Sequence, residues 1–375
     1  MDRKVLFTAS TYSHIANFHL PYLKWFQEQG WEVHAACGGK PQALAYTDEI
    51  VHLPLEKSMG SPKNLQAAGL LRKVIARERY ALISTHTALA AFFTRLALVG
   101  LRERPLVANM VHGYLFDQDT PAFKRRLLLA AEQMTAPQTD LLLTMNRWDN
   151  EAANRYRLGR RVVHIPGVGV DFSRFDQATE TARQEMRAEY GFSEAAFVLI
   201  YAAEFSQRKS QATLIRAMAE LPGEIALVLA GDGALRGDCQ KLAAELGLAD
   251  RILFPGHIRG MARWYALADA AVSSSRSEGL PFNVMEAMYA GLPVAASAVK
   301  GHVDLIREEE TGLLFPYGDA KACAAAVRRL WEDPGLRQAL SQAAQREAAA
   351  YGLDQVFPIV TAQYASLLPA QAGIV

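Results

Sequence analysis

Residues 5–10 read VLFTAS, residues 19–30 read HLPYLKWFQEQG, and residues 31–37 read WEVHAAC. The first and third segments are β-rich runs, and the second has the pattern of a helix between them. Such alternation is typical of a parallel sheet whose strands are joined by crossover helices. It continues with LQAAGLLRKVIARERY at 65–80, ALISTH at 81–86, LVANMVHG at 106–113, LLLTM at 141–145 and VVHIPG at 162–167.

A second series of strand-like runs begins after a polar segment at 171–191, which we interpret as a linker and the first helix of a new unit. The runs are FVLIYAAE at 197–204, IALVLAGDG at 225–233, RILFPG at 251–256, AAVSSS at 270–275 and PVAAS at 293–297. The GDG at 231–233 is interpreted as a structural turn, because no GxGxxG accompanies it. The sequence therefore predicts two consecutive doubly wound α/β domains.

Composition excludes several classes of protein. The chain has 375 residues, of which 50% are hydrophobic and 21% charged, as expected for a globular protein rather than a disordered or fibrous one. A net charge of +1 argues against a nucleic-acid binder. The cysteines, Cys37, Cys239 and Cys323, are too far apart for a disulfide scaffold or a cysteine-based zinc site. With no signal-peptide pattern and no apolar run of about 20 residues, we expect a cytoplasmic protein without a transmembrane helix.

Charge is distributed unevenly along the chain. Residues 1–175 hold 22 Lys and Arg against 15 Asp and Glu, a net of +7, whereas the remainder holds 18 against 24, a net of −6. Lys124, Arg125 and Arg126 stand beside the apolar run LLLAA. Two interpretations stay open: a face that meets anionic lipid head groups, which would make the protein peripheral on the cytoplasmic face of the inner membrane, or the solvated side of ordinary amphipathic helices.

The segment SRSEGLPFNVMEAMYAG at 275–291 has the pattern of a strand-to-helix loop followed by a helix. Pro281 suits the first turn of that helix, Gly279 lets a ligand approach the backbone, and Glu286 falls one turn inside. A helix start of this kind favours a phosphate, and the carboxylates of Glu278 and Glu286 suit sugar hydroxyls on either side of it. The backbone amides that we expect to face the phosphate belong to Leu280, Phe282, Asn283 and Val284.

These residues resemble the Glu-x7-Glu signature of the family 4 retaining glycosyltransferases, which have the GT-B fold. VLAGDGALR at 228–236, LGLADRILFPGHIR at 246–259, GHVDLI at 301–306 and ETGLLFPYGD at 310–319 follow in the family's order. The opening of the chain is similar to a bacterial exopolysaccharide and capsule branch. The resemblance implies two Rossmann-like domains facing each other across a cleft, an N-terminal acceptor-side domain of residues 1–175 plus 353–375 and a donor domain of 176–352, with the last helix crossing back to the first domain.

The resemblance also implies roles for single residues. Glu278 would accept hydrogen bonds from the donor sugar, Glu286 from the ribose, and His112 would contact the sugar and its phosphate. The family's basic pair is usually an Arg and, five positions later, a Lys; here Glu204 replaces the Arg, Lys209 keeps its place, and the adjacent Arg208 would supply the second cation.

Further contacts follow from the same resemblance. The nucleobase would rest on the backbone of Gly256, His257 and Ile258. Tyr12, His14 and Asn17, in a loop after the first strand, are candidate acceptor contacts, although Ser13 or Asn17 capping the next helix explains that loop equally well.

Together these features predict a retaining hexosyltransferase that moves a hexose or N-acetylhexosamine from a UDP-sugar to a polyprenyl-diphosphate-linked glycan during synthesis of a bacterial surface polysaccharide. No cofactor or divalent metal is expected, because the two cations and the helix dipole would neutralise the charge of the diphosphate in place of a metal. Two alternatives stay open: a GT-B sugar-nucleotide epimerase or phosphorylase, and a non-catalytic module that binds a nucleotide sugar.

Overall fold

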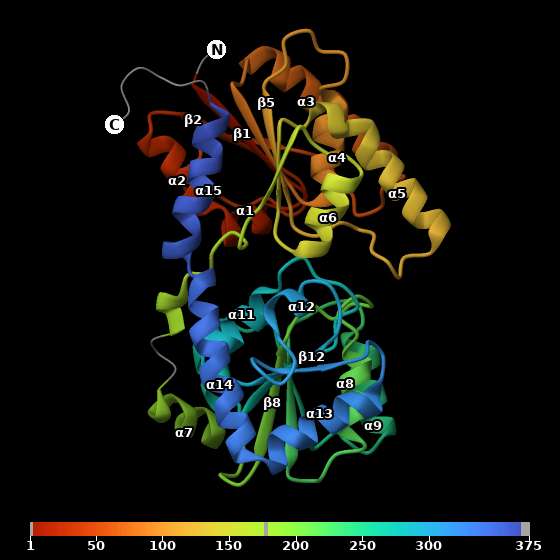
Figure 1. Cartoon of the computed structure of the whole chain (residues 1–375), viewed down its shortest axis with the longest axis vertical. Helices are drawn as coiled ribbons and strands as arrows, with labels where there is room; N and C mark the ends of the chain where they lie inside the picture. Colours follow the sequence, from red (N-terminus) through yellow and green to blue (C-terminus); the bar gives the residue numbers. More distant parts are fainter. Residues whose placement is uncertain (1–2, 176–178, 369–375) are drawn as a thin grey trace. The chain divides into compact units, whose positions relative to one another are not determined.

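The computed structural model describes residues 3–175 and 179–368, and the chain divides into two compact units (Figure 1). The first unit is Met1–Gly169 together with Val356–Val375, and the second is Val170–Gln355. The sequence placed the corresponding limits at 175 and 352. Residue 176, where the predicted donor domain begins, and the end of the predicted tail from 369 lie outside the described residues.

The first unit is built on a seven-stranded sheet in which all neighbouring strands are parallel. The strand order is β3-β2-β1-β4-β5-β6-β7. The strands are β1 (Lys4–Ala9), β2 (Glu32–Cys37), β3 (Glu49–His52), β4 (Leu82–His86), β5 (Leu106–Val111), β6 (Leu141–Thr144) and β7 (Arg161–His164). Because the order reverses between β1 and β4, the carboxyl ends of these two strands form the crevice in which doubly wound sheets bind ligands.

Helices cover this sheet (Figure 1). Its apolar side chains are buried against them. They are α1 (Tyr12–Phe18), α2 (Leu20–Glu28), α3 (Pro62–Glu78), α4 (Ala88–Ala97), α5 (Ala122–Thr135), η1 (Ala136–Gln138) and α6 (Arg147–Arg155). The limits of α3 follow from its sequence: the Ser61 side chain caps the Lys63 amide, Pro62 supplies the φ of the first turn, and Arg79 ends the helix in the left-handed conformation.

The second unit has a six-stranded parallel sheet with the order β10-β9-β8-β11-β12-β13. The strands are β8 (Phe197–Ala202), β9 (Ile225–Ala230), β10 (Ile252–Gly256), β11 (Ala270–Ser273), β12 (Val294–Ser297) and β13 (Leu313–Phe315). The order reverses between β8 and β11. Gly231 and Gly233 let the segment after β9 approach its neighbour closely, because a Cβ on Gly231 would collide with the carbonyl oxygen of Ala203 and one on Gly233 with that of Phe205. The turn predicted at 231–233 begins only at Gly233, whose carbonyl accepts from the Arg236 amide at 3.2 Å.

Helices also cover the sheet of the second unit (Figure 1). They are η2 (Phe172–Phe175), α7 (Glu180–Glu189), α8 (Gln211–Met218), α9 (Arg236–Glu245), α10 (Met261–Leu267), α11 (Phe282–Tyr289), α12 (His302–Leu305), α13 (Ala320–Glu332), α14 (Pro334–Ala348) and η3 (Ala349–Tyr351). α13 begins at a side-chain cap, Asp319, whose carboxylate accepts from the Ala322 amide. Its apolar face, including Cys323 and Val327, joins the main core of the unit.

The last helix, α15 (Leu353–Leu367), begins in the second unit and packs on the first from Val356 onward. The Tyr364 hydroxyl lies 2.8 Å from Oγ of Ser84, and the Phe357 ring stacks on Tyr22 of α2 at 5.5 Å between centroids. The predicted return of the last helix to the first domain is confirmed. None of the helices within residues 3–175 and 179–368 combines the length and apolar character that would let it cross a membrane.

Candidate functional site

In the second unit, hydrogen bonds join the segments that follow β8 and β11 at the point where the strand order reverses. The Tyr201 hydroxyl lies 2.8 Å from Oγ of Ser275, and Oγ of Ser274 donates to the carbonyl of Lys209 at 3.0 Å. The Arg276 amide donates to the carbonyl of Arg208 at 2.8 Å. These contacts hold the two predicted site segments, 204–209 and 275–286, next to each other.

Glu278 lies at the centre of this site and is paired with both predicted cations. Its Oε1 lies 2.6 Å from Nζ of Lys209 and its Oε2 lies 2.7 Å from Nη1 of Arg208. Burial alone would raise the pKa of Glu278, but the two cations outweigh it and lower the pKa to about 2. The carboxylate is therefore ionised, and the three groups together carry one net positive charge.

A neutral histidine that the sequence analysis did not single out lies behind Glu278. His302 is buried; its Nδ1 lies 2.8 Å from the carbonyl of Ser297, to which it must donate, so Nε2 accepts from the Ser273 hydroxyl at 3.0 Å. Burial lowers the pKa of His302 to about 4. The sequence feature that could have indicated His302 is the GHVDLI segment. Its Gly301 lets the backbone pass close to Glu278, because a Cβ on Gly301 would lie 2.8 Å from Cβ of Glu278.

The helix start after Glu278 differs in two details from the prediction. Pro281 is the N-cap of α11, with extended φ and ψ of −78° and 117°, rather than a residue of the first turn. The Val284 amide, which was expected to face a phosphate, instead donates to the carbonyl of Pro281 at 3.2 Å, a bond of the 3₁₀ type between a residue and the third residue before it, which satisfies an amide in the first turn of the helix. The segment Gly279–Asn283 remains as the candidate phosphate-binding part of the loop.

Glu286 lies one turn inside α11, as expected, but in a different electrostatic setting from Glu278. The Tyr265 hydroxyl is 3.3 Å from its Oε2, and Nη2 of Arg174 is 3.9 Å from its Oε1. The Glu286 side chain is 15% exposed and the Arg174 side chain 63%. Burial, only partly offset by Arg174 and Tyr265, raises the pKa of Glu286 to about 7.

The predicted nucleobase loop follows β10. Gly256 is the last residue of β10 with φ of +79°, and its carbonyl accepts from the Gly231 amide at 2.8 Å, which joins the ends of β10 and β9. His257 is exposed and Ile258 is half-buried. Glu204, which occupies the place of the family's arginine, contributes its carbonyl to Nε2 of Gln211 at 2.9 Å.

In the first unit, the predicted acceptor loop is helix α1 rather than a loop. Thr11, and neither Ser13 nor Asn17, is its N-cap, because the Thr11 side chain accepts from the His14 amide. Asn17 is exposed, whereas Tyr12 is buried and its hydroxyl lies 3.1 Å from Nδ1 of His52.

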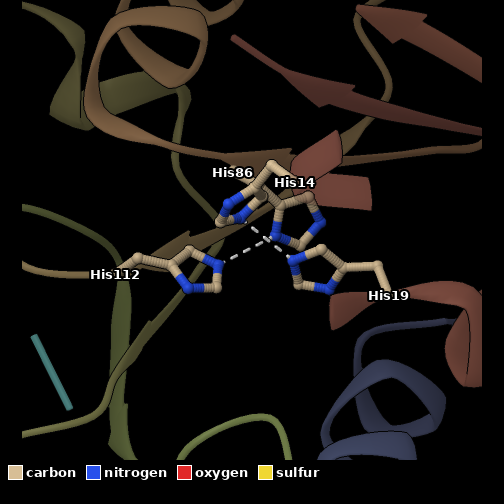
Figure 2. A group of neighbouring side chains, drawn as sticks. All are labelled: His14, His19, His86 and His112. Carbon is tan, nitrogen blue, oxygen red and sulfur yellow. Dashed lines mark hydrogen bonds between the residues drawn. The ribbon is translucent and has the colours of Figure 1, made fainter. Parts of the chain in front are cut away.

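His112 follows directly after β5, as the sequence indicated, and lies against other histidines. Its ring centroid is 4.4 Å from that of His14. Two residues missing from the sequence prediction, His19 and His86, complete the group (Figure 2). One signal was present in the sequence: His86 is the last residue of one strand-like run, and His112 is the last but one of the next.

Comparison with known proteins identifies the class. The GT-B fold is shown by crystal structures such as that of Anabaena HepE in complex with UDP and glucose, which has a TM-score of 0.80 and 19% identity and covers 97% of this chain and 99% of that one. Residues 18–167 match the "Glycosyl transferase 4-like domain" and residues 182–347 match "Glycosyl transferases group 1".

Two curated relatives extend over most of the chain. The putative glycosyltransferase EpsD of Bacillus subtilis (strain 168) is 36% identical over 353 residues, which cover 93% of this chain and 92% of EpsD. A D-inositol 3-phosphate glycosyltransferase of Xylanimonas cellulosilytica is 27% identical over 84% of this chain and 81% of that protein. The chain therefore belongs to the family of GT-B glycosyltransferases described by the 4-like and group 1 domains. This confirms the predicted resemblance.

Proposed function

We propose that this glycosyltransferase moves a hexose or N-acetylhexosamine from a UDP-sugar, with retention, to a polyprenyl-diphosphate-linked glycan in the synthesis of a bacterial surface polysaccharide such as an exopolysaccharide or capsule. The observation that carries the proposal is the group of Glu278, Arg208 and Lys209 beside the start of α11. It combines two cations, a helix N-terminus and an ionised carboxylate at the carboxyl ends of the central strands.

The donor fits this group by charge. Arg208 and Lys209 would bind the non-bridging oxygens of the diphosphate, and the segment Gly279–Asn283 would add backbone donors. Glu278 would then exchange part of its ion pairing for hydroxyls of the transferred sugar, and Glu286 would accept from the ribose. HepE, which shares the fold, was crystallised with UDP and glucose, and this supports a UDP-sugar donor.

Transfer breaks the bond between the anomeric carbon and the diphosphate oxygen and forms a bond from that carbon to the acceptor oxygen. The acceptor proton passes to the leaving phosphate oxygen on the same face of the sugar, which gives retention without a carboxylate nucleophile. The cations stabilise the charge that develops on UDP, so we propose no divalent ion at the diphosphate. The contact of His112 with the donor stays a prediction, as do those of Tyr12, His14 and Asn17 with the acceptor and of the Gly256–Ile258 loop with the base.

The direct test is a screen of UDP-glucose, UDP-galactose and their N-acetylamino counterparts with a polyprenyl-diphosphate glycan. We expect UDP release that depends on the acceptor and an anomeric configuration that NMR shows to be unchanged in the product. Interconversion of the UDP-sugar without acceptor would identify an epimerase instead. Binding of UDP-sugars without turnover, across acceptors of different glycan structure, would support the non-catalytic alternative.

The membrane part of the proposal rests on α5. Phe123 and Leu127 are 82% and 63% exposed, and Met134 continues the same face at helical spacing. Lys124 and Arg126 are exposed and flank this apolar stripe on its two sides. An apolar stripe bordered by cations is typical of helices that lie in the interface of an anionic bilayer. We infer that α5 brings the first unit to the membrane that holds the lipid-linked acceptor.

Sedimentation with liposomes tests this docking. We expect binding to vesicles that contain an anionic phospholipid, little binding to zwitterionic ones, and weakening by salt, since exposed charges are screened within about 8 Å at physiological ionic strength. Phe123→Ser and Lys124→Gln should each weaken binding, whereas Leu246→Ser, at an exposed apolar site of the second unit, should not. Equal binding by all variants, or full transfer to a soluble acceptor without any lipid binding, would contradict the membrane proposal.

A further inference from the structure

Four histidines of the first unit meet where its strand order reverses. His14 lies on α1, His19 lies between α1 and α2, His86 is the last residue of β4, and His112 follows β5. Figure 2 shows the four rings close together, and its dashed lines mark the hydrogen bonds that join His14 to His19 and His86 to His112. Each ring offers a nitrogen, and these four nitrogens all lie within 4.8 Å of one another.

Two of the distances between these nitrogens match those of a tetrahedral metal site. Nε2 of His19 is 3.3 Å from Nε2 of His14, and Nε2 of His112 is 3.4 Å from Nδ1 of His86. Four nitrogens bound to a tetrahedral zinc ion at 2.0–2.1 Å are separated by about 3.3–3.4 Å. Two edges of the tetrahedron therefore already have the required length, and the other pairs of nitrogens lie within 4.8 Å. Binding an ion would require the rings of His19 and His86, whose centroids lie 3.8 Å apart, to separate.

The protonation chemistry also favours a metal ion. Burial lowers the pKa of all four imidazoles, and for His19, His86 and His112 the neighbouring rings lower it further. No carboxylate within the described part of the chain contributes to these changes. The rings are therefore neutral, the form in which imidazole binds metals. Without an ion, two neighbouring neutral rings can share only one hydrogen bond, in which one ring donates its N–H and the other accepts with its lone pair. A metal ion instead accepts a lone pair from each of the four rings.

We propose that His14, His19, His86 and His112 form a binding site for a divalent transition-metal ion of the zinc type. Four protein ligands close the coordination sphere, so the ion is structural and joins α1, the α1–α2 junction and the ends of β4 and β5. It is separate from the leaving-group chemistry, which uses residues of the second unit. Coordination through Nε2 of His112 keeps the proton on Nδ1, which leaves that nitrogen able to serve as a donor to a substrate.

Metal analysis of the full chain, expressed without a histidine tag, tests the site. We expect about one zinc ion per chain, with X-ray absorption showing nitrogen ligands at about 2.0–2.1 Å. After removal of the metal, Co²⁺ should bind with the intense visible absorption of tetrahedral coordination. A chain that is purified without metal and gives no such absorption with one equivalent of Co²⁺ would overturn the proposal.

Substitutions then assign the ligands. His19→Gln and His86→Gln should each weaken Co²⁺ binding by about 100-fold or more, because loss of even an outer partner of a metal ligand costs about 10–100-fold. His164→Gln, at an exposed end of β7, is the matched control and should bind Co²⁺ as the natural chain does. Unchanged affinity in folded variants would overturn the assignment. Should either variant fail to fold, the coordination of Co²⁺ in the natural chain decides, since an octahedral or oxygen-rich spectrum would also contradict the proposal.

Discussion

Replacing Glu286 by glutamine should stabilise the second unit at neutral and alkaline pH. Its carboxyl group, on α11, has a tyrosine hydroxyl at 3.3 Å and only the exposed guanidinium of Arg174, 3.9 Å away, to offset its charge. Glutamine retains an oxygen that can accept from Tyr265, and it removes the group that is costly to ionise. We therefore expect a variant that folds more stably and binds the donor less well.

The magnitude follows from the displaced pKa. In the unfolded chain the group ionises near 4.5, and in the folded chain its pKa is raised to about 7. Between these values the folded protein holds a proton that the unfolded chain has released, so the free energy of unfolding falls as the pH rises. At 1.36 kcal/mol per pH unit, the total is about 3 kcal/mol, most of it lost between pH 5 and pH 8. The amide that Glu286→Gln introduces does not titrate, so the variant would keep this stability.

Scanning calorimetry of both proteins at pH 5, 6, 7 and 8 measures the difference. At about 2–4 °C per kcal/mol for a domain of this size, the advantage of Glu286→Gln should grow by about 5–10 °C from pH 5 to pH 8 in the transition of the second unit. Glu245→Gln, at an exposed position of α9, is the control and should show no such trend. An advantage that does not depend on pH, or that shrinks as the pH rises, would refute the reasoning.

Three further predictions concern the same unit. Lys209→Ala should lower turnover by about 10²-fold or more in a UDP-release assay, whereas Lys241→Ala on the exposed side of α9 should not; equal rates in both would place the leaving phosphate elsewhere. Gly301→Ala should destabilise the unit by about 2 kcal/mol, because φ is +83° and the new Cβ would lie 2.9 Å from the carbonyl of Gly279, and an unchanged Tm would contradict this. Transfer should proceed in EDTA without added Mg²⁺ or Mn²⁺, and strong activation by either ion would argue against charge neutralisation by Arg208 and Lys209; the histidine site is judged by metal content rather than by this assay.

The sequence predicted best those strands that are buried on both faces. The predicted runs at 5–10, 81–86 and 197–204 correspond to β1, β4 and β8, which lie in the middle of their sheets. Two edge strands, β3 and β13, were missed. β3 is short and mostly exposed, so its sequence, EIVH, lacks a buried apolar run, and β13 has only three residues. The other two edge strands, β7 and β10, were predicted, because their sequences, VVHIPG and RILFPG, keep a run of apolar residues.

The residues from Glu278 to Glu286 were predictable because they are close in sequence. Arg208 and Lys209 lie about 70 residues away and were predicted from the family resemblance, and the structure brings both into direct contact with Glu278. The partners of Glu286, Arg174 and Tyr265, belong to no motif of that resemblance, and only tertiary packing brings them together. The histidine group was missed for the same reason. Its members belong to α1, the α1–α2 junction and the ends of β4 and β5, with no ligand spacing between His19 and His86 for a sequence to reveal.

The path of α15 has a consequence for biosynthesis. Tyr22, Phe26 and Ser84 are specified early in the chain, but the ring that packs among them belongs to Tyr364. A ribosome has therefore translated the entire second unit before the first can be completed. Until then the nascent first unit lacks the Tyr364 side chain, which is 0% exposed in the finished protein. The core positions that this ring fills are meanwhile open to water. Premature termination after residue 355 would leave a complete second unit attached to a first unit whose core cannot close.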